Sequence, residues 1–182
     1  MEYDRADKEV AEMSKIKVNE QRAVDEFQEL TAIDAPSFGE RQMADRLIVK
    51  LKELGFEVEE DNAGKHFGGN AGNLYAYLPG DLPGDPVLLS GHMDTVELSK
   101  GKKGIIGEDG VIRSAGKAVL GADDVAGLVE ILEGIRSVKE AGVHTGISRF
   151  FLQCRRAYIK AAAYLIFQRF VQKKPMYWIL AD

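Results

Sequence analysis

Hydrophobic and polar residues alternate along the first 141 residues with two distinct periods. Apolar positions recur at helical spacing over 19–33, 44–54 and 122–141, which predicts three amphipathic helices. Ser37 and Glu40 have the spacing of a capping box, so we expect them to begin the second helix, which ends at Gly55. Each predicted helix has one apolar side that must pack against another element.

The stretches between these helices have the character of strands. Residues 56–60 alternate between apolar and polar, 73–78 form an aromatic-rich run, and 87–89 are continuously apolar. A small hairpin is predicted over 105–112, with its turn at Asp109-Gly110. Helices that alternate with strands predict an α/β domain of three layers, sheet and helices, in which ligand sites lie at the carboxyl ends of the strands.

A histidine and an aspartate follow the last apolar run directly. The run continues through Ser90 and Gly91 into His92, and Asp94 follows two residues later. Side chains two apart in an extended chain point to the same side, so both project from the end of the predicted strand. The pattern is typical of a metal-binding imidazole whose tautomer is fixed by a carboxylate. For this motif alone, a surface histidine near a strand end is the alternative.

A second carboxylate pair, Asp123 and Asp124, stands at the predicted start of the third helix. Imidazole and carboxylate ligands without a nearby thiolate pair suit zinc, cobalt or manganese. A carboxylate such as Asp123 can bridge two cations about 3.5–4 Å apart, and such a pair stabilises the tetrahedral intermediate of amide hydrolysis. For an isolated Asp-Asp pair the alternative is a helix N-cap, but its occurrence with His92 favours the metal interpretation.

The composition limits the classes of function. The chain has 182 residues, of which 45% are hydrophobic and 29% charged, as expected for one soluble domain with a sizeable core. The single cysteine, Cys154, excludes an internal disulfide framework and is compatible with a cytoplasmic location. The sequence predicts neither a signal peptide nor a membrane helix. The net charge of −5 argues against nucleic acid as a partner.

The charges are distributed very unevenly. Of the 29 acidic residues, all but Asp182 lie within 1–140, and the charged residues of 141–181 are all lysine or arginine. The same stretch contains eight of the 15 aromatic residues, and residues 164–174 combine aromatic and basic positions in a loosely amphipathic pattern. An alternative function is therefore non-catalytic, with this basic tail binding an acidic partner or a membrane surface.

Four segments together resemble the peptidase T (tripeptidase) type of dinuclear zinc exopeptidase. They are Ser90–Val96, Gly101–Gly104, Gly107–Ile112 and Leu120–Gly127, within a resemblance that extends over residues 18–145. The resemblance implies a cytoplasmic metallopeptidase of the tripeptidase or aminopeptidase kind. Such an enzyme hydrolyses short peptides with a water activated by two zinc ions.

The resemblance also implies a role for each candidate site residue. His92 would bind one zinc ion, and Asp123 would bridge both ions. Asp94 would be the catalytic-site carboxylate that orients His92. Asp124 would follow the bridging aspartate, often across a strained peptide bond in this family.

The chain departs from the family after the bridging aspartate. The family has a strand that ends in Phe-Thr-Val-x-Glu-Glu, whose first glutamate is the general base and whose second is a metal ligand. Here Arg155 and Arg156 stand in place of that pair, and arginine neither binds zinc nor accepts a proton. We therefore expect 1–145 to be the N-terminal portion of a truncated catalytic domain without its lid domain, with little or no turnover from this polypeptide.

A change of reading frame after Thr145 would explain the atypical basic and aromatic tail over 146–182. With the frame advanced by two nucleotides, codons for Phe150–Gln153 permit Phe-Phe-Thr-Val, and those for Met176–Ile179 must read Val-Leu-Asp. We hypothesise that this tail is out of frame. Sequencing the encoding DNA is expected to reveal a second frame that continues the peptidase motif after codon 145. Codons that cannot yield Phe-Thr-Val in another frame would refute the hypothesis.

Overall fold

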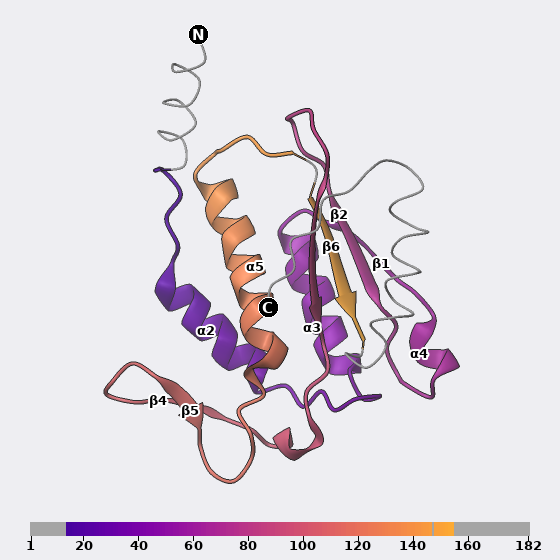
Figure 1. The fold of residues 1–182 in the computed structure, drawn as a ribbon, viewed down its shortest axis with the longest axis vertical. Helices are drawn as coiled ribbons and strands as arrows, with labels where there is room; N and C mark the ends of the chain where they lie inside the picture. Colours follow the sequence, from indigo (N-terminus) through magenta and orange to yellow (C-terminus); the bar gives the residue numbers. More distant parts are fainter. Residues whose placement is uncertain (1–13, 147, 155–182) are drawn as a thin grey trace.

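The computed structural model describes residues 14–146 and 148–154, which form one mixed sheet packed against helices (Figure 1). The strands are β1 (Glu57–Glu60), β2 (Leu74–Leu78), β3 (Val87–His92) and β6 (Ser148–Gln153). They lie in the order β1-β2-β6-β3. β2 is antiparallel to both of its neighbours, whereas β3 and β6 are parallel. The α/β class predicted from the sequence is confirmed.

Three long helices pack on this sheet, close to the bounds predicted from the sequence. They are α2 (Glu20–Thr31), α3 (Arg41–Glu53) and α5 (Ala122–Glu140). All three contribute to one hydrophobic core with a single face of the sheet, on which Leu74, Ala76, Phe150 and Leu152 are buried. Within the described ranges, the chain thus supplies the sheet and one helical layer of the predicted three-layer domain.

The smaller elements lie in the connections. α4 (Ala63–His66) follows β1, and a short 3-10 helix, η1 (Glu97–Ser99), follows β3. The predicted hairpin is formed by β4 (Gly104–Ile106) and β5 (Ile112–Ser114), and Gly110 adopts the positive φ of 76° that its turn requires. None of the helices described is long and apolar enough to cross a membrane.

The start of the predicted tail is an interior strand of the sheet. β6 lies between β2 and β3, and Phe150, Phe151 and Leu152 are fully buried. In the parallel register Gln153 lies opposite His92. The boundary predicted at 145/146 therefore lies just before β6, so the first residues of the predicted tail are part of the sheet. The remainder of the predicted tail, from Arg155 onward, lies outside the described residues.

The capping box predicted for α3 is wrong. Glu40 occupies the N-cap position, but its side chain makes no capping hydrogen bond there and instead accepts one of 2.6 Å from the Phe38 N–H. The Ser37 hydroxyl donates to Asp94 rather than to the helix. A tertiary contact thus outcompetes the local cap that the spacing of Ser37 and Glu40 predicted.

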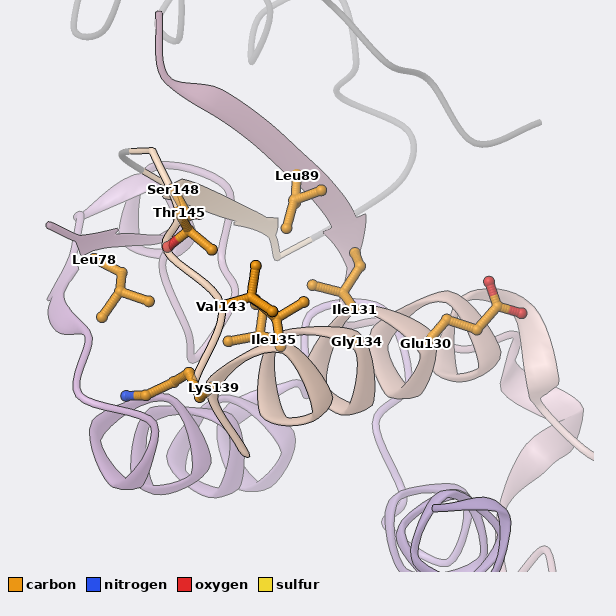
Figure 2. A pocket seen from close by; sticks show the side chains of 11 residues that line it. Leu78, Leu89, Glu130, Ile131, Gly134, Ile135, Lys139, Val143, Thr145 and Ser148 are labelled. Carbon is orange, nitrogen blue, oxygen red and sulfur yellow. The ribbon is translucent and has the colours of Figure 1, made fainter. Parts of the chain in front are cut away.

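An apolar groove lies where α5 passes alongside β3 (Figure 2). Its lining comes from β2, β3, β6, α5 and the segment after α5, and it encloses about 380 Å³. Aliphatic side chains dominate the lining, among them Leu78, Leu89, Ile131 and Ile135. Gly134 also borders the groove, and a Cβ added there would meet nothing within 4 Å. The groove is therefore an unfilled extension of the core.

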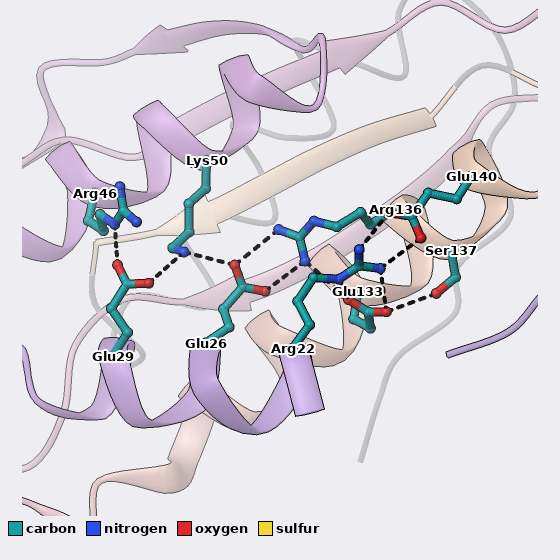
Figure 3. Close-up of polar contacts among 9 residues, drawn as sticks. All are labelled: Arg22, Glu26, Glu29, Arg46, Lys50, Glu133, Arg136, Ser137 and Glu140. Carbon is teal, nitrogen blue, oxygen red and sulfur yellow. Dashed lines mark hydrogen bonds and ion pairs between the residues drawn. The ribbon is translucent and has the colours of Figure 1, made fainter. Parts of the chain in front are cut away.

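Charged side chains hold α2 against both other long helices (Figure 3). Glu26 of α2 accepts from Lys50 Nζ of α3 at 2.9 Å and from Arg136 Nη2 of α5 at 3.1 Å. Arg22 of α2 donates to Glu133 of α5 through Nε at 2.7 Å and Nη2 at 2.8 Å. Glu26, Lys50 and Glu133 are all buried. Because an unpaired buried charge is very costly, the three helices depend on one another's charges.

Glu133 should make the fold sensitive to acid. Its hydrogen bonds with Arg22 lower the pKa of the Glu133 carboxyl from 4.5 to about 2, although burial acts in the opposite direction. A depressed carboxyl pKa stabilises the fold above the unfolded-state value, and the stabilisation is lost as the pH falls from 4.5 to about 2. We expect Glu133→Gln to lower the free energy of unfolding at pH 7 by on the order of 3 kcal/mol, measured by urea unfolding.

The deficit of Glu133→Gln should shrink below pH 4.5 and vanish only below about pH 2, where the wild-type carboxyl also becomes neutral. Glu130→Gln is the matched control, because Glu130 is exposed on the same helix. This control should unfold like the wild type at every pH. A deficit of Glu133→Gln that stays constant with pH would show that the loss comes from packing and not from charge.

Candidate metal site

His92 is the last residue of β3 and lies at the carboxyl end of the parallel strand pair. The ladder continues one residue further, because the Met93 N–H donates to the Gln153 carbonyl at 2.9 Å. Only 14% of the His92 side chain is exposed. The sheet therefore fixes this imidazole at the edge where ligand sites form in α/β domains.

Asp94 contacts the Nδ1 side of the His92 ring. Nδ1 lies 3.1 Å from Asp94 Oδ1 and 3.0 Å from the Asp94 carbonyl oxygen. The other carboxylate oxygen, Oδ2, accepts a hydrogen bond of 2.6 Å from the Ser37 hydroxyl. Because both groups facing Nδ1 are acceptors, they favour a proton on that nitrogen. In neutral His92 the lone pair of Nε2 is then available to a metal ion.

Asp123 approaches the opposite nitrogen of the same ring. Its Oδ1 lies 3.0 Å from His92 Nε2, and 67% of the Asp123 side chain is exposed. Asp123 and Asp124 both have non-helical backbone angles at the start of α5, and the peptide bond between them is cis. The structure thus brings together the three predicted site residues, His92, Asp94 and Asp123, from two segments of the chain.

Asp124 fastens the start of α5 to the end of β3. Its Oδ2 accepts a hydrogen bond of 3.1 Å from the His92 N–H. Two glycines leave room for this carboxylate: a Cβ on Gly91 would lie 2.8 Å from Oδ2, and one on Gly127 would lie 2.4 Å from Oδ1. Gly91 therefore allows the close approach of α5 to β3, and Gly127 leaves room for the Asp124 side chain within α5 itself.

The surroundings of His92 favour a positive charge. Burial lowers the pKa of the imidazole, but the hydrogen bonds to Asp94 and Asp123 outweigh burial and raise the pKa above its ordinary value. A metal cation between His92 and Asp123 would satisfy the same carboxylates in place of the proton. The donor set therefore fits a cation.

The fit is partial. The part of the chain that the structure describes contains no group of three or more His, Cys, Asp or Glu side chains that could hold an ion. β6 ends at Gln153, which lies opposite His92. Cys154 follows the strand, and burial raises the pKa of its thiol to about 11. A free thiol with that pKa stays protonated at neutral pH. The predicted substitution of the glutamate pair by Arg155 and Arg156 lies outside the described residues.

The sequence did not reveal Ser37 as part of this site. Ser37 and Asp94 are 57 positions apart, so no local spacing connects them. The local sequence pointed to a different role, because the spacing of Ser37 and Glu40 after Pro36 is that of a helix capping box. The parallel bridge between Pro36 and Thr95 and the hydrogen bonds that Thr95 donates to the Ala35 carbonyl bring the two segments together.

Comparison with known proteins shows similarity to a tripeptidase and to an aminopeptidase. A tripeptidase from Staphylococcus aureus subsp. aureus Mu50 superposes with a TM-score of 0.77 and 34% identity, over 83% of this chain and 41% of that one. The aminopeptidase PepT from Bacillus cereus ATCC 10987 superposes with a TM-score of 0.71 and 39% identity, over 74% and 36%. This region has the fold of a peptidase T-type catalytic domain. The resemblance inferred from the motifs is confirmed.

The similarity extends to one curated sequence as well. The uncharacterised protein YqjE of Bacillus subtilis (strain 168) is 37% identical over 135 residues, which are 74% of this chain and 36% of YqjE. No protein-family model matches the chain. The chain thus spans about two fifths or less of the length of these peptidase T-type proteins and of YqjE.

Gly91→Ala should disturb the site without removing any of its polar groups. The added Cβ would lie 2.8 Å from both Asp124 Oδ2 and Leu128 Cδ2, so α5 must move away from β3. Overpacking of this kind typically costs about 1–3 kcal/mol. We expect urea unfolding to show a loss in that range and NMR to show shifted His92 ring signals. Gly134→Ala on the same helix, where space is open, should not destabilise the fold. Equal stability of both variants would contradict the tight contact.

Proposed function

We propose that this chain carries the His/Asp half of a zinc peptidase site of the tripeptidase type. The observation that carries the proposal is the placement of His92 Nε2 and Asp123 Oδ1, 3.0 Å apart at the carboxyl end of β3. Similarity to a tripeptidase and to an aminopeptidase supports it. The proposed substrates are short peptides that lose their N-terminal residue in the cytoplasm.

Each described residue has a distinct task in this proposal. His92 and Asp123 would hold zinc, which supplies Lewis acidity toward a peptide carbonyl. Asp94 keeps the proton of the imidazole on Nδ1, so that Nε2 faces outward as a ligand. Ser37 holds the Asp94 carboxylate by its hydroxyl, which restricts the orientation of the whole His-Asp pair.

We further propose that the 182-residue chain by itself has little or no turnover. A general base is required beside the ions, and no acidic residue occurs between Glu140 and Asp182. The residues that follow β6 are instead Cys154, Arg155 and Arg156. The alternative function, binding of an acidic partner or a membrane surface by the basic tail, falls outside the described residues and stays a prediction.

Zinc titration of the untagged protein after treatment with EDTA tests the half-site. We expect one weak site by isothermal titration calorimetry, abolished by His92→Ala and by Asp123→Asn. Asp94→Asn should weaken zinc binding about 10–100-fold, because the orienting carboxylate is lost. Asp109→Asn, in the exposed turn between β4 and β5, is the control and should bind like the wild type. Zinc binding that survives His92→Ala would refute the proposed site.

Hydrolysis of tripeptides in the presence of zinc, cobalt or manganese tests the proposed lack of turnover. We expect no activity above that of the His92→Ala variant. Clear metal-dependent release of an N-terminal residue by the wild type, absent from His92→Ala, would contradict the lack of turnover. The same result would strengthen the assignment as a peptidase.

A further inference from the structure

Lys102 is a charged side chain buried in the loop between β3 and the β4–β5 hairpin. It lies within Gly101–Gly104, one of the four segments that resemble the peptidase T type, and only 3% of it is exposed. Its Nζ donates to the Ile33 carbonyl, and within the described ranges no carboxylate forms an ion pair with it. Burial lowers the pKa of Lys102 below its ordinary value, although Asp34 acts in the opposite direction. A buried charge without a paired carboxylate is costly, so stability alone does not account for Lys102.

The stem of Lys102 packs against the turn that begins α5. A Cβ on Gly121, the N-cap residue of α5, would lie 2.8 Å from Lys102 Cε and 2.9 Å from Cδ. Gly121 has a φ of 70°, a left-handed conformation that glycine adopts at no steric cost. Asp123 follows two residues later, so the stem of Lys102 supports the backbone from which this carboxylate projects.

The loop that contains Lys102 is also fastened to the segment after α2. Lys102 Nζ donates to the Ile33 carbonyl, and the Gly101 N–H donates to Asp34 Oδ1 at 2.8 Å. Two successive residues of one loop thus bind two successive residues of the other. The loop cannot move away from this segment without breaking both hydrogen bonds.

That segment in turn supports the Nδ1 side of the His92 ring. Thr95 donates to the Ala35 carbonyl through its N–H at 2.7 Å and through its hydroxyl at 3.2 Å. Thr95 directly follows Asp94, whose carboxylate faces Nδ1. Lys102 therefore connects the support on one side of the ring with the start of α5 on the other side.

We propose that Lys102 is a positioning residue that fixes Asp123 relative to His92 in the candidate metal site. Its stem holds the turn at Gly121, while its ammonium holds the segment that supports Asp94. His92 and Asp123 then keep one relative position before an ion arrives, and preorganised ligands bind more tightly because less order is created on binding. The inference rests on the proposed zinc site and deepens it.

Lys102→Met separates positioning from stability. Methionine keeps an unbranched stem and removes the charge, and such a replacement of a buried charge is often neutral or stabilising. We therefore expect the free energy of unfolding in urea to be equal to that of the wild type or higher. Zinc affinity, measured by isothermal titration calorimetry, should nevertheless fall about tenfold, as when a group that orients a metal ligand is lost.

Two other variants serve as controls. Lys103→Met removes the charge of the exposed neighbour and should match the wild type in both stability and zinc affinity. Lys102→Arg keeps a charged donor for the Ile33 carbonyl and should recover most of the zinc affinity that Lys102→Met loses.

Amide hydrogen exchange in EDTA tests the same role without zinc. The His92 N–H donates to Asp124 at the start of α5, so it should exchange faster in Lys102→Met than in the wild type. The Met93 N–H donates to the Gln153 carbonyl within the sheet and should exchange at the wild-type rate.

Three outcomes would overturn the proposal. The first is a Lys102→Met variant that binds zinc like the wild type, and the second is unchanged exchange of the His92 N–H. The third is a Lys102→Met variant that no longer folds, which would show a role in packing instead. A wild-type chain that binds no zinc, with the difference in exchange intact, would count only against the proposed function.

Discussion

The parallel pairing of β3 with β6 is the constraint on which the rest of the molecule depends. Parallel neighbours cannot be joined by a tight turn, so the chain must cross over the sheet, and α5 makes that crossover. α5 consequently begins at the carboxyl end of β3, where Asp123 and Asp124 reach the side chain and the backbone of His92. One connection thus builds both the sheet and the candidate site.

The two sides of the His92 ring have different surroundings. On the Nδ1 side, the Asp94 side chain is only 9% exposed and is held by Ser37, so it is a fixed support. On the Nε2 side, Asp123 is largely exposed and carries no comparable enclosure. In the proposed metal site, this difference would let an ion and a substrate approach from the Nε2 side while the Nδ1 side stays fixed.

The sequence predicted those parts of the fold that depend on local patterns. Helix bounds followed from apolar spacing, and the proximity of His92 to Asp94 followed from their two-residue separation at a strand end. The nearness of Asp123 required the family resemblance, because 31 positions separate it from His92. The role of Ser37 and the interior position of β6 could not be predicted from local spacing, since both depend on long-range contacts that compete with local preferences.

The charged contacts of α2 have a consequence for the order in which the chain can fold. Arg22 binds Glu133 and Glu140, which lie 111 and 118 positions later in the sequence. During synthesis α2 emerges from the ribosome long before those carboxylates exist, and its own charges remain solvated in the meantime. Its final docking must therefore await the emergence of α5, which makes the earliest helix of the described chain one of the last to reach its place.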